Sequence, residues 1–162
     1  MANLDQPEHE TWMRLAHREA LRALDAGEVP VGAVVVCDRQ VIGTGYNQPI
    51  RAGDPTAHAE LVALRDAAGT VHNYRLTGAT VYVTVEPCLM CAGALVHARI
   101  HTLVYGTREP RTGAVRSVMR VLDDPSHNHH VAIVEGILSD EACELMQRFF
   151  RVRRQSSDFT IS

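Results

Sequence analysis

Residues 80–98 read TVYVTVEPCLMCAGALVHA, a strand, a proline and a helix whose first turn holds two cysteines. The β-branched residues of Thr80–Val85 predict a buried strand. Pro87 then opens the helix, because proline is tolerated at the first helical position. Cys88 and Cys91 are three residues apart, so a helix places both sulfur atoms on one face, where they can share an ion.

The rest of the chain alternates between β-rich and helical stretches. Helices are predicted over residues 8–26, 58–68, 87–98, 115–122 and 139–154, and strands over 33–37, 41–46, 80–85, 102–105 and 131–134. Residues 48–56, with two prolines and a glycine, are predicted to be a loop. A hairpin followed by strands that alternate with helices implies an α/β fold, with both faces of a five-stranded mixed sheet covered.

No repeat or long linker divides the chain. We therefore expect a single domain over residues 1–162, with an ordered core at about 8–154 and a loose C-terminal tail. With 46% hydrophobic residues, the chain can bury a core without disulfide bonds. No apolar run is long enough for a membrane helix, and the acidic N-terminus does not resemble a signal peptide. We expect a cytoplasmic protein that contacts no membrane and keeps its cysteines reduced.

All 16 cationic side chains are arginine, because the chain contains no lysine. This excludes lysine Schiff-base chemistry and a P-loop lysine. The net charge of −3 conceals two basic blocks: residues 99–122 carry +4 and residues 148–162 carry +3. The two blocks suit a phosphate-facing surface, although a solvated helix face is the alternative explanation of such a pattern.

His58 and Glu60 complete a metal-binding pattern with Cys88 and Cys91. An imidazole and two thiolates suit zinc, and the electropositive N-terminus of a helix lowers the pKa of a thiol. Three protein ligands leave a fourth position for water, as in catalytic zinc sites. In the middle of a helix the side chains of His58 and Glu60 would point in different directions. We therefore expect their helix to begin at the metal, with Glu60 as the acid/base.

The other histidines and cysteines are weaker candidates for metal ligands. His97 and His101 are spaced like zinc-finger histidines but follow Cys91 too closely for a finger. The histidine tract at 127–130 has no cysteine partner for a second metal. Cys37 and Cys143 lie in apolar stretches and are predicted to be small core residues.

The pattern His-x-Glu followed by Pro-Cys-x-x-Cys resembles that of the zinc-dependent nucleobase deaminases. Further segments resemble the family of bacterial tRNA adenosine deaminases, from about Trp12 to Arg154. They are residues 28–33, 45–47, 54–60, 73–76, 86–93, 111–114, 128–129 and 149–154. The resemblance implies the cytidine-deaminase-like fold, a three-layer α/β/α sandwich.

The resemblance also implies the reaction, hydrolytic deamination of adenosine to inosine at the first anticodon position of an arginine tRNA. It implies a homodimer that binds the anticodon arm, with one zinc ion per subunit held by His58, Cys88 and Cys91, and with Glu60 as proton shuttle. The predicted substrate-binding residues are Asn47, Ala59, Glu86, Pro87, Arg108, Glu109, Asn128, His129, Phe149, Arg151, Arg153 and Arg154. Two departures are Glu109, where the family usually has Asp, and Arg116, where a small residue is common.

Two other functions stay open at this point. A deaminase of a free base or nucleoside would share the zinc centre, but the basic cluster at 151–154 and the segment 73–76 favour tRNA. A zinc module that only binds RNA needs no carboxylate beside its metal, so Glu60 favours an enzyme.

Overall fold

In the computed structural model, which describes residues 5–158, five strands form the mixed sheet that the sequence predicts. They are β1 (Gly32–Cys37), β2 (Gln40–Tyr46), β3 (Thr80–Val85), β4 (Thr102–Thr107) and β5 (Ala132–Glu135), in the spatial order β2-β1-β3-β4-β5. β1 is antiparallel to both of its neighbours, and β3, β4 and β5 are parallel to one another.

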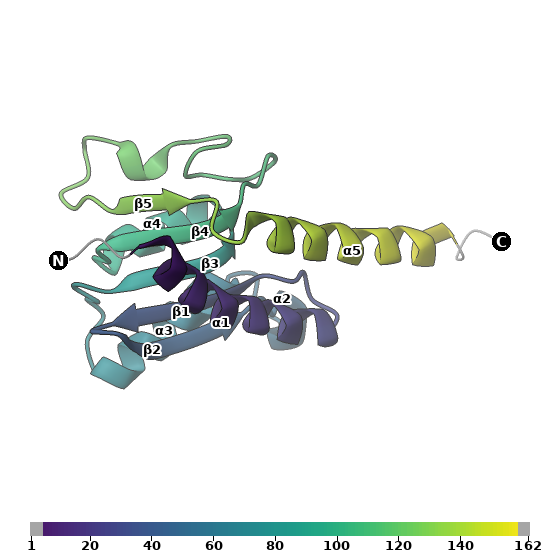
Figure 1. Ribbon diagram of the computed structural model, residues 1–162, viewed down its shortest axis with the longest axis horizontal. Coiled ribbons are helices and arrows are strands. Elements are labelled where there is room, and N and C mark those ends of the chain that lie inside the picture. Colours follow the sequence, from purple (N-terminus) through teal and green to yellow (C-terminus); the bar gives the residue numbers. More distant parts are fainter. Residues whose placement is uncertain (1–4, 159–162) are drawn as a thin grey trace.

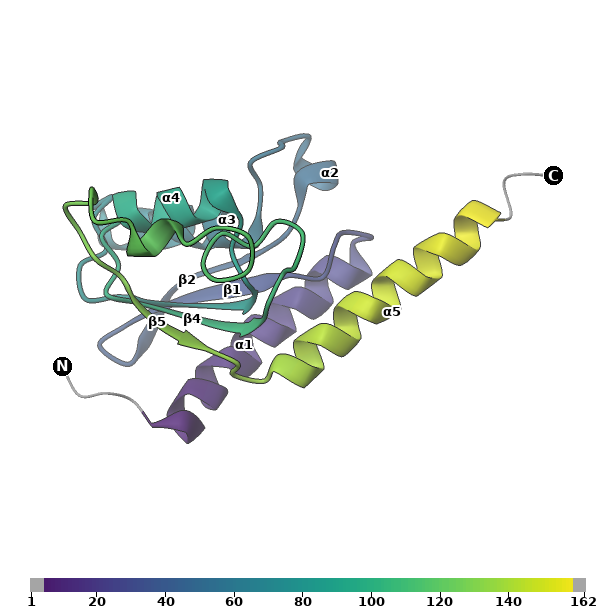
Figure 2. The ribbon, with the colours of Figure 1, turned by 90° about the horizontal axis from the view of Figure 1, so that it is seen from above.

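Helices cover both faces of the sheet, which makes the three-layer α/β/α sandwich (Figures 1 and 2). Helices α3 (Ala59–Val71) and α4 (Leu89–His97) lie on one face, together with the 3₁₀ helix η1 (Val121–Asp123). Helices α1 (Gln6–Asp25) and α5 (Ser139–Asp158) lie on the other, and the second half of α5 projects beyond the sheet.

The core follows the period-2 alternation of the strands. Val35, Val81 and Val83 pack into the cluster beneath α3 and α4, whereas Val34 and Tyr82 pack against α1. Strands that are buried on both faces read as continuous apolar runs, which is how Thr80–Val85 appears in the sequence.

The topology brings the two metal-binding motifs to one edge of the sheet. The carboxyl end of β3 leads through Glu86 and Pro87 into α4. β2, which is antiparallel to β1, ends at the same edge and leads through the short helix α2 (Pro49–Ala52) into α3. Sites in open α/β sheets usually lie outside the carboxyl ends of the strands, and this edge is such a place.

Several predicted boundaries differ from the structure. The predicted helix at 115–122 is wrong, since residues 114–117 form turns, residues 118–120 are irregular and only η1 is helical. The backbone donors of Val115, Arg116 and Ser117 bind the Glu86 carboxylate, and those of Val118 and Met119 bind the carbonyl of Gly113.

The remaining differences lie at the ends of elements. The loop at 48–56 contains α2, and α3 runs past Gly69 to Val71. Helix α5 continues through residues 155–158, which were expected in the loose tail, and residues 159–162 lie outside the described part of the chain. None of the helices described here is both long and apolar enough to cross a bilayer.

Candidate active site

His58 lies at the N-cap of α3, so the helix begins at the site, as the spacing of His58 and Glu60 predicts. Its extended backbone (φ −73°, ψ 153°) turns the imidazole away from the helix body and toward the cysteines of α4. The preceding turn is fixed by Asp54, whose Oδ1 accepts hydrogen bonds from the Thr56 amide at 2.8 Å and from its hydroxyl at 2.7 Å.

Cys88 and Cys91 face the imidazole from α4. Cys88 is the N-cap and Cys91 lies in the first turn, so one sulfur precedes the helix and the other belongs to it. The Nδ1 atom of His58 lies 3.5 Å from Sγ of Cys88 and 3.6 Å from Sγ of Cys91. All three ligand atoms lie within 4.8 Å of one another, and the cysteines are not joined by a disulfide.

These distances suit zinc. A tetrahedral ion with ordinary Zn–N and Zn–S bonds holds nitrogen and sulfur ligands roughly 3.5 Å apart. Among residues 5–158, three side chains and not four make up this group, so one coordination position is left for water. The residues present therefore fit a catalytic zinc ion.

The pKa values of the two cysteine thiols are shifted in opposite directions. A hydrogen bond from the Cys91 thiol and a weaker effect of His58 together lower the pKa of Cys88 to about 4, although burial acts in the opposite direction. The same hydrogen bond, followed by burial, raises the pKa of Cys91. Cys88 is thus a thiolate at neutral pH, ready to bind a cation.

Glu60 lies directly beside the metal-binding group and is only 4% exposed. Burial raises the pKa of its carboxyl to about 7, although a hydrogen bond with Cys91 and the charge of His58 act in the opposite direction. A carboxyl with a pKa near neutrality can both accept and return a proton, which is the property of a general acid/base.

Asn47 and Ala59 border the same edge. Asn47 follows β2, and its amide donates to the carbonyl of Val31 at 3.0 Å. Its side chain is half-buried and has no hydrogen-bond partner among the described residues, so it is available to a ligand. Ala59 is fully buried at the start of α3, where it can offer only its backbone.

Glu86 and Pro87 are both buried between β3 and Cys88. The Glu86 carboxylate points into the loop at 109–117 and accepts hydrogen bonds from it. Burial acts to raise its pKa, but these hydrogen bonds outweigh it and lower the pKa. Predicted as a substrate contact, Glu86 therefore uses its side chain within the protein.

Arg108 and Glu109 begin this loop, and both side chains have partners in the chain. Arg108 forms two hydrogen bonds with Glu135 of β5, a residue that the sequence analysis missed. Glu109 accepts a hydrogen bond from the Arg111 amide at 2.9 Å. Arg116, the second departure from the family, pairs with Asp123 at 3.1 Å.

A cavity of about 1020 Å³ lies between this loop and α5. Besides Val85, Cys143 and Phe150, its lining includes Arg108, Arg111, Arg151, Arg153 and Arg154. The metal-binding residues are not part of the lining, but Val85 lies one residue before Glu86 and three before Cys88. The cavity is a basic recess at the carboxyl ends of β3 and β4, since Val85 and Thr107 also line it.

The two phenylalanines of α5, Phe149 and Phe150, differ in their exposure to solvent. Phe149, predicted to bind substrate, is 6% exposed, and the Arg153 guanidinium lies 5.1 Å from its ring centroid. Phe150 is 42% exposed and lines the cavity. The helical spacing of Ala142, Leu145 and Phe149, all buried, could have shown which phenylalanine faces inward.

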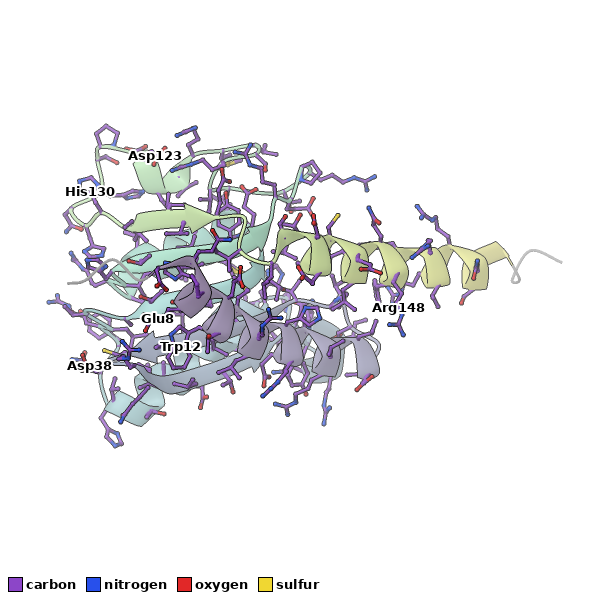
Figure 3. The ribbon with its side chains drawn as sticks, viewed as in Figure 1. Glu8, Trp12, Asp38, Asp123, His130 and Arg148 are labelled. Atoms are coloured by element: carbon purple, nitrogen blue, oxygen red, sulfur yellow. The ribbon has the colours of Figure 1, made fainter. Side chains whose placement is uncertain are left out.

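Asn128 and His129 lie at the opposite end of the sheet from the metal-binding group. They precede β5, whereas the metal site follows the carboxyl end of the parallel strand β3. Figure 3 labels the neighbouring His130 at the end of the molecule where Asp38 lies, away from Arg148 on α5. His129 Nε2 lies 2.7 Å from the carbonyl of Ile100, so this ring joins two loops of its own chain.

This site on this fold defines a zinc-dependent hydrolytic deaminase. Residues 6–107 match the family model of the cytidine and deoxycytidylate deaminase zinc-binding region. The chain is 47% identical over 147 residues to the tRNA-specific adenosine deaminase of Haemophilus influenzae, and the match covers 90% of this chain and 85% of that protein. The chain therefore belongs to the cytidine and deoxycytidylate deaminase family, among the tRNA-specific adenosine deaminases.

Two solved structures share the fold. One comes from a study of A-to-I editing by tRNA:A34 deaminases at the wobble position, and is 41% identical with a TM-score of 0.81, covering 83% of this chain and 98% of that one. The guanine deaminase of Nitrosomonas europaea is 22% identical with a TM-score of 0.71, covering 86% and 83%. At 22% identity, the similarity to the guanine deaminase shows a shared fold and nothing more.

Proposed function

We propose that this protein converts adenosine to inosine at the wobble position of a tRNA anticodon. The observation that carries the proposal is the buried Glu60 beside His58, Cys88 and Cys91, in a chain 47% identical to a tRNA-specific adenosine deaminase. A group of three ligands with an adjacent carboxyl suits hydrolysis at a purine carbon, because that reaction needs an activated water and a proton carrier.

Glu60 carries both protons of the reaction in this proposal. Zinc held by His58, Cys88 and Cys91 supplies a Lewis acid that lowers the pKa of water. Glu60 takes one proton from the attacking water and gives it to N1 of adenine, while the oxygen bonds to C6. Glu60 then transfers the remaining hydroxyl proton to the amino nitrogen, the C6–N bond breaks, and ammonia leaves. The products are inosine and ammonia, which together contain all the atoms of adenosine and water.

Asn47 is our candidate for recognition of the base. Its carboxamide carries both a donor and an acceptor, and neither has a partner among the described residues. The backbone near Ala59 and Glu86, which are close in the chain to His58 and Cys88, would frame the purine. A base that has been turned out of its stack is recognised in this way, by hydrogen bonds to its edge inside a fitted pocket.

The basic cavity between the loop at 109–117 and α5 is our candidate for binding the phosphodiester backbone of the anticodon arm. Arg151 and Arg154 of α5 line it together with Arg111 of the loop, and Phe150 offers an exposed ring for stacking. Guanidinium groups pair well with phosphates, and aromatic rings stack on unpaired bases. We propose an arginine tRNA as substrate and the cytoplasm as the place of reaction.

We further propose that the enzyme works as a homodimer. Leu89 of α4 and Val118 and Met119 of the following loop expose apolar side chains, with exposed fractions of 55%, 54% and 47%. Asn128 lies at the far end of its own sheet, so as a substrate contact it would serve the site of the second subunit. Mass measurement in solution tests the dimer.

The direct test uses zinc-loaded protein and total tRNA. After incubation, sequencing should read G in place of A at the wobble position of arginine tRNA, because inosine pairs like guanosine. Free adenosine, guanine and cytidine, offered in parallel, should stay unchanged. Conversion of a free base or nucleoside without conversion of tRNA would contradict the proposal.

A further inference from the structure

The carboxylate of Glu86 organises a loop that begins 23 residues later in the chain. Its Oε1 accepts the amide of Glu109 at 3.1 Å. Its Oε2 accepts the amides of Val115 at 3.1 Å, Arg116 at 2.8 Å and Ser117 at 3.0 Å. The hydroxyl of Ser117 also donates to Oε1. One side chain thus satisfies five donors of the loop at 109–117.

Gly113 shows independently how closely this loop approaches the carboxylate. A methyl group added at Gly113 would lie 2.5 Å from both Cδ and Oε2 of Glu86, and 2.5 Å from the carbonyl oxygen of Glu109. Beside it, the amide of Ala114 donates to the carbonyl of Pro87 at 2.8 Å. The loop is therefore joined to both residues that precede Cys88.

A glutamine cannot replace this glutamate without loss. A carboxylate has only acceptors, and every partner of Glu86 is a donor. No salt bridge within residues 5–158 joins an arginine to Glu86; its charge is balanced mainly by the backbone amides and the Ser117 hydroxyl, and the charge of Arg108 also acts on it. A carboxamide would point its NH₂ group at backbone N–H donors and leave some of them buried without a partner.

We propose that Glu86 is a positioning residue that holds the loop at 109–117 against the metal-binding turn and thereby shapes the wall of the substrate site. Glu109, Pro110 and Arg111 of this loop line the basic cavity, and Arg108 before them is held by Glu135. The carboxylate of Glu86 therefore fixes the loop, and that of Glu135 fixes the residue before it. The effect on catalysis rests on the proposed function, since it requires that the cavity binds RNA.

The test compares Glu86→Gln with the milder Ser117→Ala and with the control Asp66→Asn. Asp66 also accepts one backbone amide, that of Thr44 at 2.9 Å, but it joins α3 to β2 away from the loop. Hydrogen exchange at the amides of 109–117 reports on the loop, zinc content on the metal, and steady-state deamination of tRNA on the substrate site.

We expect Glu86→Gln to speed amide exchange in the loop by about 10- to 100-fold, because the amides lose their buried acceptor. The zinc content should remain at one ion per chain. The value of kcat/KM should fall by at least about 10-fold, mainly through a higher KM, since Glu60 and the ligands are untouched. Ser117→Ala should shift exchange and KM in the same direction by about 2- to 5-fold, and Asp66→Asn should stay within about twofold of wild type.

Three outcomes would overturn the proposal: unchanged exchange in Glu86→Gln, loss of zinc, or a fall in kcat with KM unchanged. If Glu86→Gln does not fold, Ser117→Ala takes its place, and its amide exchange, zinc content and KM are compared with those of wild type and Asp66→Asn. A wild-type protein without activity on tRNA would contradict the proposed function, whereas the exchange measurement would still decide whether Glu86 holds the loop.

Discussion

Glu135 of β5 holds Arg108 through two parallel hydrogen bonds, from Nη2 to Oε1 at 2.9 Å and from Nε to Oε2 at 3.1 Å. The hydroxyl of the buried Tyr105 donates to the same carboxylate at 2.5 Å. Arg108 was predicted to bind substrate, yet two of its five donors are committed to its own chain. Any contact with RNA would use the others.

This network predicts a dependence of stability on pH. The hydrogen bonds from Arg108 and then from Tyr105 lower the pKa of Glu135 from its ordinary 4.5 to about 2. Because the pKa is lower in the folded state, the stabilisation is fully present above pH 4.5 and is lost as the pH falls toward 2. Glu135→Gln should lower the free energy of unfolding at pH 7 more than at pH 3, measured by urea denaturation.

An equal loss at both pH values would show that the charge of Glu135 does not stabilise the fold. The matched control is Glu144→Gln, which changes an exposed carboxylate on α5. It should leave the free energy of unfolding within about 0.5 kcal/mol of wild type at both pH values.

Gly45 sets how closely α3, the helix that carries Glu60, approaches the sheet. A methyl group at Gly45 would lie 2.5 Å from the amide nitrogen of Ala63 and 2.6 Å from the carbonyl oxygen of Ala59. Gly45→Ala should therefore cost about 1–3 kcal/mol of unfolding free energy, by overpacking. Gly69→Ala, on the same helix with no atom within 4 Å of the added methyl, should stabilise by up to about 1 kcal/mol. Thermal denaturation of both variants checks this, and destabilisation by Gly69→Ala would contradict it.

The metal should stabilise the fold as well as support the reaction. Zinc held by His58, Cys88 and Cys91 would join the N-termini of α3 and α4. A ligand that binds only the folded state stabilises it by about 4 kcal/mol at 1,000 times its Kd. Chelation should lower the melting temperature reversibly, and zinc should restore it. Cys88→Ser should abolish the response, whereas Cys37→Ser, which changes a cysteine on β1 outside the group, should retain it. A response that survives Cys88→Ser would place the ion elsewhere.

Binding of tRNA should depend on salt through α5. Each phosphate contact that is removed reduces the slope of log K against log salt by roughly one. Arg151→Gln and Arg154→Gln should each weaken binding and reduce the slope, because both residues line the basic cavity. Arg39→Gln, at the hairpin on the other end of the sheet, is the control and should leave the slope unchanged. Filter binding between 50 and 200 mM salt checks this, and equal slopes for all variants would assign the cluster to a solvated face.

The metal-binding group could be predicted from the sequence because its geometry depends on local structure. His58 and Cys88 both stand at helix starts, and the spacing to Glu60 and Cys91 required only that those helices begin at the site. The sheet could be predicted too, because β-branched runs such as Thr80–Val85 alternate with helical stretches.

The remainder depended on contacts between distant segments. Glu86 accepts hydrogen bonds from residues that lie 23 to 31 positions later in the chain. A periodic sequence pattern cannot predict that this carboxylate, and not a helix, binds the amides of that segment. Phe149 and Phe150 are adjacent, so packing against the sheet decides which one is buried. Asn128 and His129 were assigned by resemblance, and the parallel register of β4 and β5 places them away from the metal within one chain.

Glu60 as the proton carrier beside three zinc ligands is the central claim, and Glu60→Gln tests it most directly. Inosine at the wobble position and zinc content are measured on the same preparations of variant and wild type. We predict that kcat falls by about 10²- to 10⁴-fold while one zinc ion per chain is retained, because the side chain is an acid/base and not a ligand. Retained activity, or loss of the zinc, would contradict the account.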